Sequence, residues 1–244
     1  MHKQILFIIL LISTGLLAQP SDYYLNKESK EDTNSPELSK FQFGLKISPS
    51  IAWINAIHND VQADGATFKF GVGAIASYRI ASLLSFVTGI NYNGLGGYVF
   101  DNKSLNDVSI KGSYKINYSE IAIPIALKLQ TPMIKKTSYF LQGGFSAGFI
   151  TIANEKYYPV AANTDPIYVD ISSFTSPARI SYQVGAGIEY SIGKKSSFFG
   201  VIAYNNSVTN VANSVNYTSG TTPRYTSPIQ LLPGSMEFSI GIIF

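Results

Sequence analysis

The chain has 244 residues, a formal net charge of +3 and 14% charged residues, against roughly 25% in soluble domains. Its 16 tyrosines, 15 phenylalanines and 20 glycines are typical of β-strands whose outer surface need not face water. The small net charge and the lack of a basic run argue against nucleic-acid binding, and the absence of cysteine excludes disulfides, thiolate metal sites and an N-terminal lipid-modified cysteine.

The first 40 residues read as an export signal followed by a polar leader. Lys3 and the apolar run 5–12 precede small residues that end at Ala18, which predicts a signal peptide over 1–18. A membrane anchor is the less favoured alternative, because the apolar run is shorter than the ~20 residues that a spanning helix needs. Residues 19–40 are polar and mixed in charge, which predicts a flexible periplasmic leader.

From Phe41 to Phe244, apolar and polar residues alternate in blocks. Period two places each set on one face of a strand. One face carries apolar and aromatic residues, and the other carries small, polar or charged ones. We expect eight strands, which start at 41 and continue at about 68–79, 84–93, 120–129, 139–149, 179–190, 198–205 and 235–244.

A soluble sandwich would show the same alternation with its apolar face inward, but the blocks reach the ~9–11 residues of a tilted membrane strand. Connections also alternate in length, as periplasmic turns and external loops do. The sequence therefore predicts an eight-stranded antiparallel transmembrane β-barrel of the outer-membrane type over 41–244. Short connections fall near 80–83, 131–137 and 193–196, and long ones near 58–66, 99–113, 153–178 and 206–234.

The fourth block is irregular. Pro124 cannot donate a hydrogen bond to a strand ladder, and Ile116 and Tyr118 have the opposite parity to the apolar run 121–129. A bulge near Ser119–Glu120 would explain the change of phase and would let Tyr118 face the lipid. We expect interfacial aromatic girdles of Tyr78, Tyr139, Tyr190 and Phe198 on the short-turn side, and of Phe68, Tyr92, Tyr118 and Tyr204 on the long-loop side.

The chain resembles the PorT-like outer-membrane β-barrel proteins over about residues 41–244. The matching segments are the opening FQFGLKISPS, NYSEIAIPIALKLQ, YQVGAGIEYSI and the terminal MEFSIGIIF. The resemblance implies an outer-membrane location, contact with outer-membrane lipid and lipopolysaccharide, and recognition by the outer-membrane assembly machinery. It also keeps open an accessory role in a secretion or assembly system. The residues that look like an assembly signal are Met236, Phe238, Ile240, Ile242 and Phe244.

The sequence offers little for catalysis or metal binding. Barrel enzymes that modify lipid A, or cleave proteins, generally use a histidine beside a serine or a carboxylate. His58 is the histidine that remains after signal cleavage, and no defined partner is identifiable near it. His58, Asp60 and Asp64 do not form a recognisable metal site. We therefore expect no enzyme, cofactor or metal, and a lipid A-modifying enzyme remains only an alternative.

Charged residues on the inward parity point to the interior of the barrel. An isolated charge in a narrow interior should pair, because an unpaired one carries a large desolvation cost. Eight strands leave an interior just wide enough for side chains, which favours a filled lumen over a narrow channel. We expect a structural or surface-binding protein with a lumen charge network of Lys46, Lys69, Arg79, Glu120, Lys128, Arg179, Glu189 and Glu237.

Overall fold

The computed structural model describes most of the chain from residue 40 onward. The predicted signal peptide and nearly all of the predicted leader lie outside the described residues, as does His58. The barrel belongs to the compact unit Pro36–Phe244. The described ranges are 40–57, 61–101, 104–105, 108–109, 112–159, 167–193, 196–212, 218–219, 222–223 and 230–244.

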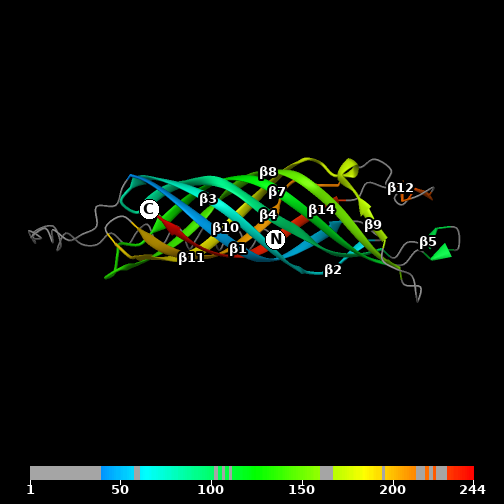
Figure 1. Ribbon diagram of the computed structural model, residues 1–244, viewed down its shortest axis with the longest axis horizontal. Helices are drawn as coiled ribbons and strands as arrows, with labels where there is room; N and C mark the ends of the chain where they lie inside the picture. The colour runs from blue at the N-terminus through cyan, green and yellow to red at the C-terminus, as the bar shows by residue number, and fades with distance from the viewer. Residues whose placement is uncertain are drawn as a thin grey trace, which may run out of the picture. The chain divides into compact units, whose positions relative to one another are not determined.

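Eight long strands form a closed antiparallel barrel (Figure 1). Each barrel strand pairs with the next one along the chain, and the last strand pairs with the first, so each has two neighbours. The eight-stranded antiparallel barrel predicted from the sequence is confirmed. The strands are β1 (Phe41–Ile57), β3 (Thr67–Ala81), β4 (Leu84–Asp101), β7 (Gly112–Gln130), β8 (Thr137–Pro159), β10 (Ala178–Ser191), β11 (Ser197–Ser207) and β14 (Gln230–Ile243).

The two ends of the barrel differ in their connections. One end, the short-turn rim, holds the connections 82–83, 131–136 and 192–196. Both ends of the barrel chain also meet at this rim, where the Phe43 N–H donates to the Phe244 carbonyl at 3.0 Å and the Phe244 N–H donates back at 2.8 Å. The opposite end, the loop rim, is where β1 and β11 finish. In outer-membrane barrels the short connections are the periplasmic turns and the long connections are the external loops.

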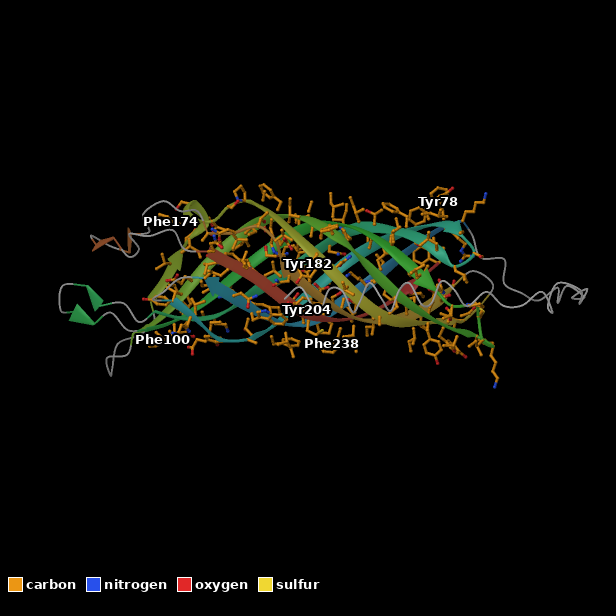
Figure 2. The ribbon with its side chains drawn as sticks, turned by 180° about the vertical axis from the view of Figure 1, so that it is seen from behind. Tyr78, Phe100, Phe174, Tyr182, Tyr204 and Phe238 are labelled. Carbon is orange, nitrogen blue, oxygen red and sulfur yellow. The ribbon has the colours of Figure 1, made fainter. Side chains whose placement is uncertain are left out.

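Large apolar side chains cover the outer face of the barrel. Exposed and buried residues alternate along each strand, so that Phe43, Ile123 and Phe145 are all at least half exposed. Figure 2 shows side chains standing off the ribbon around the strands, with Tyr78 near one end and Phe238 along the body. An exposed apolar surface of this extent marks contact with a membrane or with another protein.

Three barrel strands continue past the loop rim. β4, β7 and β8 have 18, 19 and 23 residues, well above the ~9–11 needed to span a membrane. Beyond the last β3–β4 and β8–β10 pairs, β2 (Val61–Gly65) joins the edge of β4 and β9 (Ile167–Asp170) joins the edge of β8. We call this five-stranded extension, ordered β2-β4-β7-β8-β9, the projecting sheet.

The projecting sheet corrects part of the predicted loop pattern. The polar stretches 99–113 and 153–178 were expected to be loops, but β4, β7, β8 and β9 extend into them. A hairpin can extend into a polar stretch if the side chains of one of its faces pack on an apolar core. Here every second residue of these strands packs on an apolar cluster inside the barrel. The remaining short elements are β5 (Ser104–Leu105), β6 (Val108–Ser109), β12 (Thr218–Ser219), β13 (Thr222–Pro223) and the 3-10 turn η2 (Ser172–Phe174).

The predicted irregularity in the fourth block is present, but its effect is different from the expected one. The register between β7 and β8 shifts at Ser119–Glu120, and the extra residue is Thr151 on β8. β7 itself keeps one parity, so Ile116 and Tyr118 face inward together with Glu120. The expectation that Tyr118 belongs to the outer aromatic girdle is therefore wrong: its side chain is 3% exposed, packed in an interior apolar cluster.

Candidate functional site

Side chains from all around the barrel meet in its interior, where three layers can be distinguished. A lower layer near the short-turn rim and a central layer each hold a buried ion pair. A third, apolar layer lies toward the loop rim. These layers determine whether the barrel interior could conduct ions. They contain most of the residues of the predicted lumen charge network.

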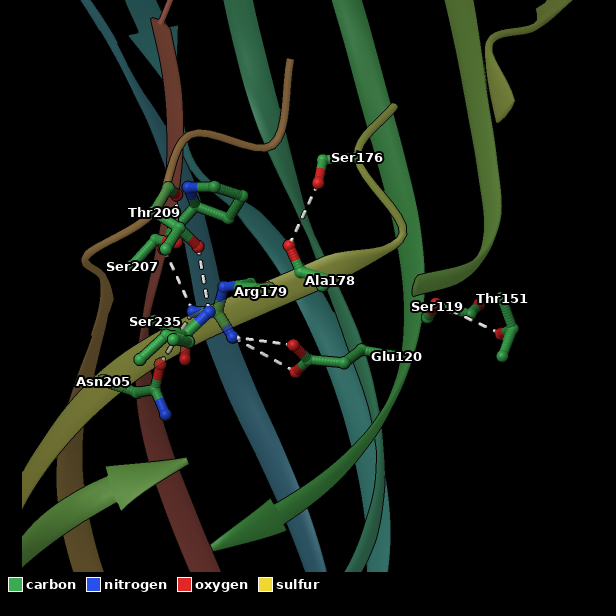
Figure 3. Close-up of polar contacts among 12 residues, drawn as sticks. Ser119, Glu120, Thr151, Ser176, Ala178, Arg179, Asn205, Ser207, Thr209 and Ser235 are labelled. Carbon is green, nitrogen blue, oxygen red and sulfur yellow. Dashed lines mark hydrogen bonds and ion pairs between the residues drawn. The ribbon is translucent and has the colours of Figure 1, made fainter. Parts of the chain in front are cut away.

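The central layer is built around Arg179 and Glu120. Nη1 of Arg179, on β10, donates to both carboxylate oxygens of Glu120, on β7, at 3.0 and 3.1 Å (Figure 3). Both side chains are at most 2% exposed. β8 runs between them, and Gly148 on β8 is the register partner of Arg179. A Cβ at Gly148 would overlap the Glu120 carboxylate, so glycine at this position makes room for the ion pair.

Arg179 also reaches the far wall of the barrel. Its Nη2 donates to Asn205 Oδ1 at 2.8 Å on β11 and to the Pro233 carbonyl at 3.2 Å on β14 (Figure 3). One guanidinium thus ties together β7, β10, β11 and β14 across the lumen. Glu237 lies in the same layer and accepts a hydrogen bond from Ser235 Oγ at 3.4 Å. A planar guanidinium with several donors suits this bridging role better than an ammonium group.

The lower layer is built around Lys128 and Glu189. Lys128 Nζ lies 2.8 Å from Glu189 Oε2, and both side chains are 5% exposed. The same ammonium group sits 4.9 Å from the ring centroid of Phe140. Gln130 Nε2 adds a donor to the Glu189 carboxylate at 3.4 Å. The layer therefore joins β7, β8 and β10 near the short-turn rim.

A small cavity opens beside this lower layer. Its volume is about 60 Å³, and Lys46, Ser77, Asn91 and Gln183 are among its lining residues. Ser77 Oγ and Asn91 Oδ1 are buried without a hydrogen-bond partner among the described residues. Since one water molecule takes up ~30 Å³ in the liquid, the cavity has room for a few waters that could satisfy these atoms.

The interior toward the loop rim is apolar. Tyr114, Ile116 and Tyr118 of β7 pack there against Leu95 of β4 and Ile54 of β1, and each is at most 3% exposed. This layer was not predicted, because the inward face was expected to be small and polar throughout. The available signal was the unbroken parity from Tyr114 to Glu120. The other members of the apolar layer are Val61, Val99, Ile150, Ala153, Ile171, Val211 and Leu231.

The predicted lumen residues are not all where the sequence suggested. Lys69 is the correction. Lys69 has inward parity on β3, where it is the register partner of the buried Ser50 of β1, but β3 is no longer paired with β4 here, because that ladder ends at Gly71↔Asn93. Its side chain lies against Gly94 and donates to Asn117 Oδ1 at 2.6 Å, on the outer face of β7. Arg79 has inward parity close to the short-turn rim, and no described side chain pairs with it.

A closed antiparallel barrel with an apolar outer face and a polar central interior is the architecture of an outer-membrane protein. A family model described as "Outer membrane protein beta-barrel domain" matches residues 17–213. The chain belongs to this family. It is an outer-membrane protein, and family membership suggests association with outer-membrane lipids and lipopolysaccharide. The match is broader than the PorT-like group that the sequence resembles.

Solved structures of outer-membrane barrels are similar in fold. Neisserial surface protein A is 12% identical, with 84% of this chain and 97% of that chain covered and a TM-score of 0.42. OprG from Pseudomonas aeruginosa is 10% identical, with 83% and 93% covered and a TM-score of 0.47. The protease OmpT from Escherichia coli is 7% identical, with 86% and 97% covered and a TM-score of 0.39. These values carry no argument about activity. A search of curated proteins found no match.

A second group of polar residues, apart from those of the interior, lies on the outer face of the projecting sheet of this outer-membrane barrel. Lys115 Nζ lies 5.5 Å from the ring centroid of Tyr98, and Lys156 Nζ lies 5.2 Å from that of Tyr158 and 4.9 Å from that of Tyr168. These residues were not predicted, because Lys156, Tyr158 and Tyr168 fell in an expected loop and the expected strands stopped short of Tyr98 and Lys115. Alternation of Lys and Tyr with buried residues along β7 and β8 was the available signal.

The described residues show no group of three or more His, Cys, Asp or Glu side chains that could hold a metal ion. Asp64, one of the carboxylates weighed for such a site, accepts a hydrogen bond from Ser113 Oγ at 2.7 Å. His58 and Asp60 lie outside the described residues. Over the same part of the chain, no helix is long and apolar enough to cross a membrane.

Proposed function

We propose that this outer-membrane barrel is a non-catalytic protein with a structural or surface-binding role and a lumen that does not conduct ions. The observation that carries the proposal is the filling of the interior by successive layers. The central ion pair crosses from β7 to β14 through Arg179, and the apolar layer covers it on the side of the loop rim.

A channel would need a continuous path of water through all three layers. The central layer offers none without separating Arg179 from Glu120, and separating a buried pair leaves an uncompensated charge. The apolar layer is lined by side chains that cannot replace the water of a passing ion. The cavity beside the lower layer, about 60 Å³, stops short of both.

The surface-binding part of the proposal rests on the projecting sheet. Its inner face is fixed by the apolar layer, through residues such as Val99 and Ala153, so its outer face is held rigidly. A rigid platform costs less conformational entropy on binding than a flexible loop does. The projecting sheet is therefore the surface on which we expect a partner to bind.

We also propose that the outer-membrane assembly machinery recognises the C-terminal end of β14. Met236, Phe238, Ile240, Ile242 and Phe244 share one parity, and Phe238, Ile240 and Phe244 are exposed on the outer face. Their apolar side chains remain available after the two neighbouring ladders have formed, since β14 pairs on one side with β11 and on the other with β1.

Planar-bilayer recording tests the non-conducting lumen. The full chain, folded in detergent and reconstituted, is expected to give no steady unitary current at any applied voltage, while a porin reconstituted in the same way gives one. Heat-modifiable migration of the same sample shows that the protein is folded. Steady current from folded protein would overturn the proposal and favour a narrow channel.

A further inference from the structure

The outer face of the projecting sheet presents one continuous row of lysine and tyrosine side chains. Tyr98, Lys115, Lys156 and Tyr168 are register partners across β4, β7, β8 and β9. Figure 1 shows β9 beside the end of β8, at the same end of the barrel as β2. The row is thus a property of four paired strands and does not depend on a loop.

The row stands directly above the apolar outer face of the barrel. On β8, Lys156 is four residues beyond Ile152, which is exposed and is the last apolar residue of the outer face on that strand. A tilted strand rises by less than ~3.3 Å per residue, so the row lies on the order of 10 Å above the apolar face. That is the depth at which lipid headgroups meet water.

The cations of this surface lie close together. Lys69 contacts Asn117, the neighbour of Lys115 along the outer face, and Lys115 and Lys69 repel each other electrostatically. Hydrogen bonding with Tyr168, and then with Tyr158, raises the pKa of Lys156. Three ammonium groups in one area are stabilised by an anion that all of them can approach.

A hollow of about 560 Å³ lies beside the row. Asn117 and Asn154 line it together with Asp170, whose Oδ1 accepts a hydrogen bond from the Ser172 N–H at 2.8 Å. Amide and carboxylate groups of this kind bind hydroxyl groups. Tyr168, with 72% of its surface exposed, is the most exposed large apolar or aromatic side chain described and offers a ring face to the hollow. The volume is in the range of a small-ligand site.

We infer that this surface binds the headgroup of a phosphorylated glycolipid of the outer leaflet. Lys115 and Lys156 contact its phosphate, Asp170 accepts hydrogen bonds from its sugar hydroxyl groups, Asn154 donates to them or accepts from them, and the sugar ring stacks on Tyr168. Asp170 is an anion and would repel a bare phosphate, so the sugar belongs on its side of the hollow. The acyl chains then run down the apolar face below.

The test is native mass spectrometry of the detergent-folded full chain with bis-phosphorylated lipid A as the probe. We expect bound lipid A on the unaltered protein, and an affinity at least tenfold lower for the double variant Lys115→Gln/Lys156→Gln, since it removes both ammonium groups that contact the phosphate. The matched control, Lys136→Gln/Lys40→Gln, removes the same charge from exposed residues at the short-turn rim and is expected to bind as the unaltered protein does.

Two further ligands show whether binding depends on the lipid phosphate, on the rest of the lipid, or on free anions. Dephosphorylated lipid A is expected to bind the unaltered protein more weakly than lipid A does. The Lys115/Lys156 variant is expected to bind the two lipids with equal affinity. Inorganic phosphate at the same concentration is expected not to compete. Tyr168→Ala should weaken both lipids, because it removes the sugar contact.

Equal lipid A affinity of the two double variants would overturn the inference, as would equal binding of phosphorylated and dephosphorylated lipid. Competition by inorganic phosphate would show a free-anion site and would also overturn it. All variants change side chains on the outer surface that are exposed or partly exposed, and heat-modifiable migration verifies that each one folds. None of these outcomes depends on whether the lumen conducts.

Discussion

At the scale of single residues, Gly148 controls the central ion pair. The substitution Gly148→Ala would push a methyl group into the Glu120 carboxylate and separate it from Arg179. We expect a loss of up to ~3–5 kcal/mol in the free energy of unfolding, the cost of breaking a buried pair, measured by urea titration in lipid vesicles.

Gly143→Ala on the same strand is the matched control. The nearest atom to its added Cβ is the Gln183 carbonyl oxygen at 3.9 Å, which is ordinary contact. The free energy of unfolding of this variant should stay close to that of the unaltered protein. If both alanine variants lose the same stability, the cause is the loss of glycine from β8 and not the ion pair.

The pairing itself can be measured with a double-mutant cycle on Glu120 and Arg179. Glu120→Gln or Arg179→Met alone should cost ~3–5 kcal/mol, because each strands a buried charge. The double variant should cost less than the sum of the two. It will not be neutral, since Asn205 and the Pro233 carbonyl lose their donor. The readout is again the free energy of unfolding.

A second cycle, on Lys46 and Glu237, provides the contrast. The first and last barrel strands, β1 and β14, are neighbours, which makes these residues a plausible pair from the sequence, but the register places Lys46 opposite Gly241 and Ser50 opposite Glu237. Their effects on stability should therefore add. A coupling as large as that of Glu120 and Arg179 would show that the described register of β1 and β14 is incorrect.

These residues show where sequence reasoning stops. Alternation was enough to predict that Glu120, Lys128, Arg179 and Glu189 have inward parity. It could not name partners, because Arg179 and Glu120 are separated by β8 and meet only in the register that the whole barrel sets. Lys69 keeps the predicted inward parity, but its side chain reaches Asn117 on β7 past the end of the β3–β4 ladder, a contact that parity alone does not predict.

At the scale of elements, the bulge at Thr151 sets which face of β8 looks inward beyond the membrane. Deleting Thr151 alone would leave a regular ladder with Ile152 still opposite Ser119, but deleting Thr151 and Ile152 together would reverse the parity of 153–159, turning Asn154 and Lys156 in and Ala153 out. We expect the projecting sheet to separate from the apolar layer and to become sensitive to protease, while the barrel below still inserts. Limited proteolysis of reconstituted protein would measure this.

Thr151→Ala is the control for that deletion. It keeps the residue count and removes only the hydroxyl group that donates to the Ser119 carbonyl at 3.2 Å. The parity of β8 is unchanged, so the protease pattern should match that of the unaltered protein. Equal sensitivity of both variants would mean that the loss of the hydroxyl group, and not the reversed facing of 153–159, destabilises the sheet.

The facing of β14 is tested by Phe238→Lys. Phe238 lies on the outer face along the body of the barrel (Figure 2), where a lysine costs ~2–4 kcal/mol near mid-depth. We expect less heat-modifiable protein in the outer membrane than for Phe238→Leu, which keeps an apolar side chain. Equal membrane insertion of the two variants would show that Phe238 does not face lipid.

The strand elements of the membrane region were predictable because one face of each strand meets lipid, and that enforces a strict period of two. The region beyond the loop rim was not. There the outer face meets water, as loops do, so polar residues no longer distinguish a strand from a loop. The inward run Tyr114, Ile116 and Tyr118 was read with the wrong parity because the bulge was assigned to β7 instead of β8.

At the scale of the whole molecule, the orientation of the barrel can be tested with cysteine probes, because the chain contains no cysteine. Gln62→Cys on β2 should react with a membrane-impermeant maleimide on intact cells, since the loop rim is expected outside. Lys136→Cys, at the short-turn rim, should react only after the outer membrane is permeabilised. The reverse pattern would invert the barrel and place the lysine–tyrosine row in the periplasm.

The pairing of β1 with β14 has a consequence for the time course of folding. These strands are the first and last of the barrel, and residues such as Leu45 and Ile242 pair across nearly the full length of the chain. Contacts of such high sequence separation form slowly, because loop-closure entropy is lost before they stabilise anything. Until the last residues arrive, an open sheet exposes two unpaired edges that can pair with another chain. Its vulnerability to aggregation therefore lasts until the final strand closes the ring.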